Sequence, residues 1–315
     1  MYSLHTLLLS TTLNQFDTAE DATVKDDLKT LGWLPGSQIS HAIKLNRTAE
    51  FLIGRPKLAD KISTRALLTL SFHAHQDECI LSKPISAFVS PMKVADPKVL
   101  KVSIEDNGEP CIDLLSLNNP RIKHMQELDQ RFKPSHNQSG FVRKSVHDAL
   151  LKMLSHLPEN IGIAIYEGLR PLTTQRKYFQ KKLKEIRKSE PDETKARAKT
   201  SALVSPPDIT PVHCTGAAID LTLFSMREHF LLDLGKFGVI FGPNDHASTF
   251  SDEVSTIQKV NRVLLLRAAL LSNLVNYGRE WWHYSLKDRV WAIAKGEKRA
   301  SYGIPSLDEK KPRRQ

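Results

Sequence analysis

The sequence predicts a soluble, globular protein that mixes α-helices with β-strands. Apolar residues alternate with other residues over 161–166 and 218–224, as they do in strands. Over 146–157 and 257–277 they recur instead at helical spacing. The chain has 315 residues, of which 40% are hydrophobic and 25% charged. That length is enough for one large domain or for two ordinary ones.

The motifs described below divide the chain into three parts. Residues 1–92 carry no recognisable motif and are expected to form an N-terminal accessory region. Residues 93–305 are predicted to form the main domain, which carries all of these motifs, and 306–315 a basic tail.

The N-terminal region contains a few local patterns. Residues 22–34 fit a short amphipathic helix, while 65–72 and 79–89 are apolar enough for strands or buried segments. His73 and His75 are spaced like alternate residues of a strand, which could hold a metal, but no third ligand follows nearby.

The first elements expected in the main domain are a hairpin and a helix. Leu100, Val102 and Ile104 share one face of a strand, Asn107-Gly108 marks a turn, and a second strand resumes at 111–115. Ser145 is placed to cap the helix that follows.

The strand predicted at 161–166 leads directly into Arg170-Pro171. The proline stops the strand, and an arginine at a strand's end is well placed to point into a cleft. A basic helix is expected from about Thr173 to Lys188, followed by a charged loop as far as Pro211.

The stretch from His213 to Asp220 holds one imidazole and one carboxylate seven positions apart. In the strand at 218–224, Asp220 lies on the face opposite to Ile219 and Leu221, so it can face His213 in the loop that enters the strand. Gly216 is expected where the backbone turns between the two.

A long helix over 257–277 is expected to stop at Gly278 and to be followed by a strand or tight turn at 280–284. In an ideal strand Glu280 and His283 would face opposite sides, because three steps change the face. Both can reach one metal only if the backbone bends between them.

These residues together match the composition of a catalytic zinc site. His213, Asp220 and His283 would supply three N/O ligands and leave a fourth position for water, whose pKa the metal lowers. Glu280 would act as general base and later pass the proton to the leaving amine. Arg170 would stabilise the oxyanion. The predicted reaction is hydrolysis of an amide or peptide bond.

Each piece has a structural alternative when taken alone. His-x6-Asp pairs are usually structural, and Glu-x-x-His is common by chance. Cys214, beside His213, could be a ligand or a nucleophile, but no general base is arranged for it. Trp281 and Trp282 are expected to be walls of the site rather than reactive groups.

Three motifs in this order resemble the zinc D-alanyl-D-alanine dipeptidases of the vancomycin-resistance type. The motifs are Glu167-Gly168-Leu169-Arg170-Pro171, the His213–Leu223 segment with Gly216 and Asp220, and Glu280-Trp281-Trp282-His283-Tyr284. These dipeptidases are relatives of the D,D-carboxypeptidases that share the Hedgehog-like fold. The resemblance covers about residues 95–300.

The resemblance implies an α+β fold with a central antiparallel sheet flanked by helices, here with an N-terminal extension. It implies one Zn²⁺ held by His213, Asp220 and His283. It also implies Glu280 as the catalytic base and Arg170 as the transition-state stabiliser. The implied substrate is D-Ala-D-Ala or a similar small dipeptide.

The sequence departs from the family pattern at positions that the resemblance implies lie close to the substrate. Glu167 and Leu169 stand where the family has Asp and Tyr, and Pro211 stands where a Ser helps to hold the substrate's amino group. In this family an Asp also binds the free amine of the substrate, and Asp245 is the candidate for that role. Asn137 is retained from another family motif, and Trp282 is a further candidate for substrate binding.

Two other functions stay open because of these departures. A zinc D,D-carboxypeptidase or endopeptidase acting on longer peptidoglycan peptides is favoured by Pro211. A zinc-binding domain without activity is opposed by the presence of Glu280 and Arg170.

The formal net charge is +10, and ten Lys and Arg lie between Arg176 and Lys199 against four acidic residues. A solvated helix face explains this segment; attraction to nucleic acid or to an acidic surface is the alternative. No nucleic-acid motif supports a nucleic-acid partner, and no apolar run approaches the length that spans a membrane.

Cys79, Cys111 and Cys214 are scattered and show neither zinc-knuckle spacing nor a disulfide framework. This usage suits a reducing compartment, so the protein is expected in the cytoplasm, with export to the periplasm as the alternative. The expected partner is a small peptide substrate. Neither nucleic acid nor a membrane is expected as a partner, and the sequence leaves the oligomeric state open.

Overall fold

The computed structural model describes residues 63–65, 67–68, 71, 85–93, 95–238 and 246–306. The expected helix at 22–34, the pair His73 and His75, and the basic tail beyond Ser306 lie outside the described residues.

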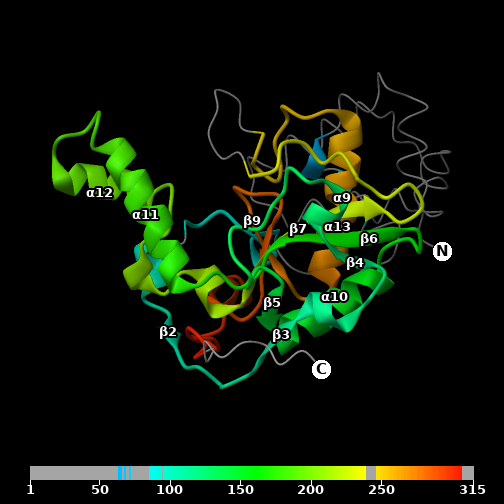
Figure 1. Ribbon diagram of the computed structural model, residues 1–315, viewed down its shortest axis with the longest axis horizontal. Helices are drawn as coiled ribbons and strands as arrows, with labels where there is room; N and C mark the ends of the chain where they lie inside the picture. The colour runs from blue at the N-terminus through cyan, green and yellow to red at the C-terminus, as the bar shows by residue number, and fades with distance from the viewer. Residues whose placement is uncertain are drawn as a thin grey trace, which may run out of the picture.

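A seven-stranded sheet forms the centre of the molecule, with the order β1-β9-β10-β7-β6-β4 and with β8 paired to β7 (Figure 1). The central strands β9, β10, β7 and β6 are antiparallel to one another, whereas β1 and β4 lie parallel to their neighbours at the edges. The prediction of an α+β fold with a central antiparallel sheet is confirmed. The parallel edge strands were not predicted. The strands are β1 (Val89–Ser90), β4 (Ile122–His124), β6 (Ile161–Glu167), β7 (Ala218–Ser225), β8 (Phe230–Leu231), β9 (Val275–Tyr277) and β10 (His283–Ser285).

The main core lies between the sheet and two long helices. Ile163, Leu221 and Leu223 from the sheet pack in one buried cluster with Leu150 of α10 and Leu266 of α13. The helices are α8 (Pro97–Leu100), α9 (Met125–Leu128), α10 (Lys144–Ser155), α11 (Leu172–Ile186), α12 (Glu193–Ser201), α13 (Thr256–Leu271) and α14 (Arg289–Lys295). None of the helices in the described ranges is both long and apolar enough to cross a membrane.

The predicted hairpin over 100–115 is wrong. The segment instead contributes to two separate two-stranded sheets: β2 (Ser103–Ile104) pairs with β11 (Arg299–Ala300), and β3 (Cys111–Asp113) pairs with β5 (Phe141–Arg143). The buried guanidinium of Arg143 holds the open segment between these two strands, because it donates to Asp106 and to the carbonyl of Glu109.

The long helix predicted over 257–277 ends early, at Leu271. Asn273 adopts a left-handed φ of 66°, which ends the helix, and residues 275–277 then form β9. Apolar spacing alone could not separate the buried strand from the helix before it.

Other local predictions also needed correction. The charged loop expected before Pro211 contains α12, which Asp192 caps by accepting the N–H of Lys195. Ser145 does not cap α10; its hydroxyl donates to Glu109. Within 65–72 the described residues are helical and several are buried, so the strand alternative is wrong there.

Described residues before position 93 share the main core. Leu67 and Phe88 belong to the central cluster, and β1 is a strand of the central sheet. The two sides of residue 92 therefore share one hydrophobic core. A separate role for residues 1–92 stays a prediction.

Candidate active site

The central sheet brings Asp220 and His283 side by side. The two residues are direct partners in the antiparallel pair of β7 with β10, so their side chains leave the same face of the sheet. Nδ1 of His283 lies 2.9 Å from Oδ1 of Asp220. Neighbouring strands thus join ligands that are 63 residues apart in the chain.

His213 reaches the same point from the 3₁₀ turn η4 (Val212–Thr215). Its Nε2 lies 3.1 Å from Nδ1 of His283 and 3.3 Å from Oδ1 of Asp220. Its Nδ1 lies 2.9 Å from the carbonyl oxygen of Gly168. Because a carbonyl can only accept, Nδ1 carries the hydrogen, and in the neutral ring Nε2 turns its lone pair toward the other two side chains.

Gly216 makes this approach of His213 to Asp220 possible. Its φ of +72° is the left-handed conformation expected from the sequence, and a Cβ there would lie 3.1 Å from the sulfur of Cys111. Arg143 fixes the same turn, since its backbone N–H donates to Gly216 and its Nε donates to the carbonyl of Thr215.

The three side chains fit a zinc ion. All three are buried, and their ligand atoms lie within 4.8 Å of one another. Tetrahedral zinc with N and O ligands at about 2.1 Å requires ligand atoms roughly 3.4 Å apart, close to the distances observed here. When His213 is neutral, its Nε2 lone pair faces an oxygen of the Asp220 carboxylate. These two acceptors repel each other, and a cation bound between them would remove the repulsion.

The carboxylate of Asp220 remains ionised in this environment. Burial raises its pKa, but the positive charge and the hydrogen bonds that His213 and His283 supply when their rings are protonated outweigh that effect and hold the pKa well below its usual range. Two imidazoles and one ionised carboxylate form a donor set that zinc accepts.

Glu280 lies beside the three ligand candidates without joining them. Its Oε2 is 4.0 Å from Nδ1 of His283, and the side chain is 16% exposed. Burial raises the pKa of Glu280, an effect that His283 partly offsets. The backbone bends between Glu280 and His283, as a shared metal site requires. The N–H of His283 donates to the carbonyl of Glu280, and the N–H of Glu280 donates to the carbonyl of Tyr277.

Asn276, which sequence reasoning missed, holds this bend. The fully buried amide donates to the carbonyls of Glu280 and His283 over 3.1 and 3.0 Å. Its oxygen accepts the hydroxyl of Thr249 at 2.5 Å, which fixes the orientation of the amide. An asparagine in a short strand is the signal that could have found it, because strands disfavour this residue.

Arg170 is held by hydrogen bonds on two sides. Nε donates to Oε1 of Glu167 over 2.9 Å, Nη2 donates to Oε2 of the same carboxylate, and Nη1 donates to Gln175 over 2.8 Å. Its backbone N–H donates to the carbonyl of His213, which ties the arginine to the candidate metal site. Despite burial, Glu167 raises the pKa of Arg170, so the guanidinium stays charged.

His136 is a second residue that the sequence did not reveal. Its Nε2 lies 2.7 Å from Oε1 of Glu167, so this carboxylate joins the loop of His136 to Arg170. Burial raises the pKa of Glu167, but the bonds from Arg170 and His136 outweigh burial and lower the pKa to about 2. Nothing in the sequence around His136 marks this contact.

Three of the remaining candidates, Asn137, Trp282 and Cys214, lie within the described residues. Asn137 is exposed in the loop that follows His136. Trp282 is 2% exposed and packs against Phe237, with ring centroids 5.2 Å apart, so little of its surface can meet a substrate. Asp245 lies outside the described residues. Burial raises the pKa of Cys214 to about 12, so its thiol is not ionised at neutral pH.

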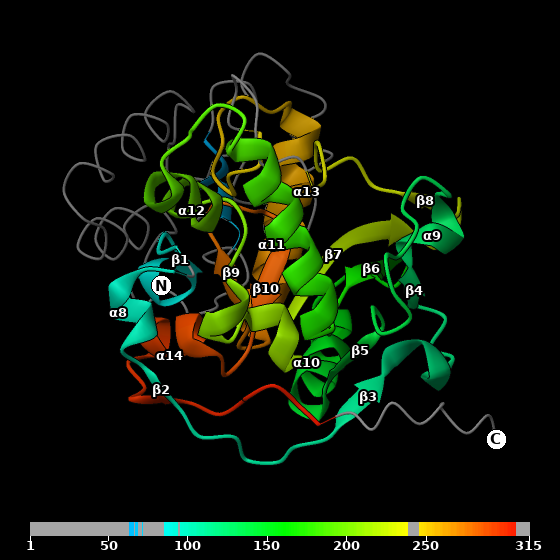
Figure 2. The same cartoon turned by 60° about the vertical axis from the view of Figure 1, so that its left-hand side comes forward.

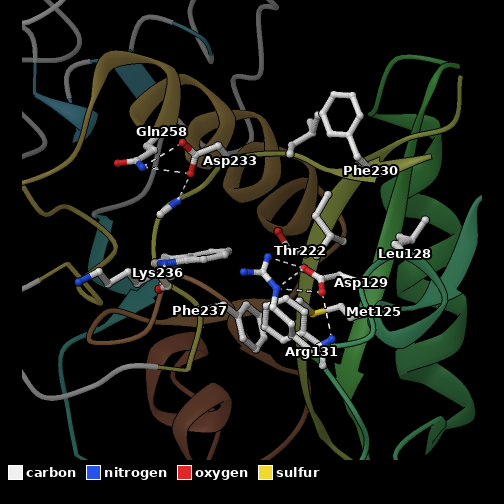
Figure 3. A pocket seen from close by; sticks show the side chains of 15 residues that line it. Met125, Leu128, Asp129, Arg131, Thr222, Phe230, Asp233, Lys236, Phe237 and Gln258 are labelled. Carbon is white, nitrogen blue, oxygen red and sulfur yellow. Dashed lines mark hydrogen bonds and ion pairs between the residues drawn. The ribbon is translucent and has the colours of Figure 1, made fainter. Parts of the chain in front are cut away.

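A pocket of about 630 Å³ opens on the same face of the sheet (Figure 3). Thr222, two positions beyond Asp220 on β7, contributes to its lining, together with Phe237 and Trp281. Asp129 and Arg131 form an ion pair of 2.6 Å at this pocket. Trp281, the neighbour of Glu280, therefore joins the pocket to the turn that carries the candidate base.

Comparisons with known proteins give one family match. The family model described as D-ala-D-ala dipeptidase matches residues 130–298. Among solved structures, the LdcB LD-carboxypeptidase, described in terms of peptidoglycan recognition, is 18% identical, with a TM-score of 0.34. The alignment covers 69% of this chain and 93% of that chain. No curated protein matches.

Proposed function

Because the chain belongs to the D-ala-D-ala dipeptidase family of peptidases, we propose that it hydrolyses D-Ala-D-Ala or a similarly small dipeptide with the help of one Zn²⁺. The observation that carries the proposal is the convergence of His213, Asp220 and His283, with Glu280 beside them. These three are the proposed zinc ligands. A bound Zn²⁺ would polarise the scissile carbonyl and make water acidic enough to attack at neutral pH.

Glu280 is the proposed general base. Its carboxylate would take the proton from the attacking water and then deliver it to the nitrogen of the leaving amino acid. Burial supports this role, because it raises the pKa of Glu280 toward the working pH. The backbone bend held by Asn276 keeps Glu280 close to the ligands.

Arg170 is the proposed stabiliser of the negative charge that develops on the carbonyl oxygen. A guanidinium offers five N–H donors, of which Glu167 and Gln175 occupy three. Two donors are therefore left for substrate. The surrounding bonds fix the orientation of the group in advance, which is what transition-state stabilisation requires.

A second candidate function is a D,D-carboxypeptidase or endopeptidase acting on longer peptidoglycan peptides. Pro211 favours it, because this residue replaces the serine that would help to hold a free amine. The two functions differ in one chemical demand, because a dipeptidase requires the free amine of its substrate.

Metal analysis combined with a hydrolysis assay tests both functions. The purified protein is expected to contain about one zinc and to cleave D-Ala-D-Ala faster than N-acetyl-D-Ala-D-Ala. Faster cleavage of the blocked peptide would select the second function. Replacing Glu280 by Gln should reduce turnover by about 100- to 10,000-fold and leave zinc bound. Unchanged turnover would remove Glu280 as the base.

A further inference from the structure

Helices α11 and α12 form an arm that projects from the body of the molecule (Figure 1). Figure 2 shows α11 along its length, with α12 beside its outer end. A small core that contains Phe179, Leu183 and Ala196 holds the two helices together. The arm starts directly after Arg170-Pro171, so its base adjoins the candidate active site. The peptidase function accounts for none of the positive charge on this arm.

Four lysines form a single row along α11. Lys177, Lys181, Lys184 and Lys188 follow one another at spacings of four, three and four residues. At about 100° per residue they fall within an arc of roughly 60°. Lys188 lies just beyond the helix, in a turn closed by its N–H bond to the carbonyl of Glu185. The row is therefore about 16 Å long.

The row lies on the outer face of the arm. All four lysines are exposed, whereas Phe179 and Leu183 on the other side of α11 are buried. No ion-pair partner for any of the four lies within the described part of the chain. The charge of the row therefore faces solvent.

The acidic residues of the arm are already engaged elsewhere. Glu185 pairs with Lys182, and Glu193 pairs with Arg187. Glu190 pairs with Lys199, and Asp192 caps α12. Between residues 176 and 199 the ten Lys and Arg exceed the four acids by 10 − 4 = 6.

We propose that this row of lysines docks the protein on the surface of an anionic phospholipid membrane. Rows of four or more lysines on one helix face attract anionic headgroups, and each contributes about fivefold to membrane partitioning at moderate salt. Because the row is straight and lies on a projecting arm, all four ammonium groups can meet a flat surface together. The proposal revises the expectation that no membrane takes part.

The observations favour a membrane surface over nucleic acid. The aromatic side chains of α11 are not available for base stacking, because Phe179 is buried and Tyr178 donates to Ser135. The large apolar residues that the described chain exposes all lie outside the arm. Docking would therefore be electrostatic and reversible, without insertion into the bilayer.

The test compares the full chain with two quadruple variants. The first replaces Lys177, Lys181, Lys184 and Lys188 by Gln, which has a helix propensity close to that of Lys. The matched control also uses Gln, and it replaces four exposed lysines outside the arm: Lys98, Lys101, Lys133 and Lys152. Each variant changes the net charge from +10 to +6, because 10 − 4 = 6. Far-UV circular dichroism and Tm confirm that both are folded.

Binding is measured by co-sedimentation with vesicles of phosphatidylglycerol and phosphatidylcholine at 3:7, and with pure phosphatidylcholine. The wild type should bind only the anionic vesicles and should release in 0.5 M NaCl. The row variant should bind at least about 100-fold more weakly, and the control within about threefold of wild type. Hydrolysis of soluble D-Ala-D-Ala should be equal in all three proteins, so this assay is independent of the proposed function.

Three results would overturn the membrane assignment. The first is wild-type protein that does not bind anionic vesicles, which would leave the row as a solvated face. The second is an equal loss of binding in both quadruple variants, which would assign the effect to net charge. The third is tighter binding of the row to a 20-base-pair DNA duplex than to the vesicles.

Discussion

The side-chain amide of Asn276 donates to the backbone carbonyl of Glu280 over 3.1 Å, and with its second hydrogen it donates to the carbonyl of His283. One buried amide therefore sets the distance between the candidate base and a candidate metal ligand. Thr249 supports it by donating to the amide oxygen. Asn276 bonds to the backbone that carries Glu280 and His283, so its role is positional.

Replacing Asn276 by Leu should lower kcat and zinc affinity together, by about 10- to 100-fold each. The side chain keeps its size but loses both donors, so the bend at Glu280 relaxes and two buried carbonyls lose their partners. Zinc affinity is measured by competition with a chelator. Thr249→Val should shift both quantities in the same direction by a smaller factor. Lower stability with normal zinc affinity and kcat would reduce Asn276 to a purely structural residue.

Replacing Arg170 by Lys should lower kcat by about 100- to 1000-fold and leave zinc bound. Lysine keeps the charge but cannot make the two-pronged bond to Glu167 and still present donors to the substrate. Steady-state kinetics separates the effects. A raised KM with an unchanged kcat would show that Arg170 serves substrate binding alone and has no special role in the transition state.

The bond between Glu167 and Arg170 also predicts how stability depends on pH. The folded-state pKa of Glu167 is about 2, against an ordinary value of 4.5. The stabilisation is therefore fully present above about pH 4.5 and is lost as the pH falls toward 2. A pKa lowered from 4.5 to about 2 contributes roughly 3 kcal/mol to the free energy of unfolding at neutral pH.

This pH dependence can be isolated from the loss of metal in acid. Unfolding of zinc-free protein is measured in urea between pH 2 and 6, for the wild type and for Glu167→Gln. The variant should be less stable at pH 6, because it leaves Arg170 without its buried partner, but its stability should fall less between pH 5 and 2. Parallel curves for the two proteins would exclude Glu167 as the source.

The sequence predicted the candidate ligands and the strand that carries Asp220 because the spacing rules were local. Alternation over 218–224 gave β7 and the direction of Asp220, and the positive φ at Gly216 followed from the turn required there. The sequence showed only that the backbone must bend at Glu280 if Glu280 and His283 are to reach one metal. It did not predict the bend itself. The cause of the bend, Asn276, acts through hydrogen bonds to two backbone carbonyls, and an asparagine in a short strand is the only trace of this role in the sequence.

Long-range pairing explains most of what could not be predicted. The segment at 100–115 looked like a hairpin, but β2 and β3 each pair with strands far along the chain. The contact of His136 with Glu167 likewise joins two loops that no periodicity connects. Helix α12 was missed because only Ala196 and Thr200 are buried along it, too few for a clear apolar stripe.

Two glycines with nearly the same backbone conformation allow the last prediction. Gly216 and Gly108 have φ values of 72° and 71°. A Cβ at Gly216 would lie 3.1 Å from Cys111, whereas at Gly108 it would meet nothing within 4 Å. Alanine at either site costs about 1 kcal/mol for the left-handed backbone, but only Gly216→Ala also pushes on the turn that carries His213.

Gly108→Ala should therefore lower the free energy of unfolding by about 1 kcal/mol and leave zinc affinity unchanged. Gly216→Ala should lower it further and also weaken zinc binding, because a displacement of η4 moves Nε2 of His213 away from Asp220. Urea unfolding and chelator competition measure the two quantities on each variant. Equal zinc affinity in both would mean that the position of His213 does not depend on the turn at Gly216, against the geometry that joins them.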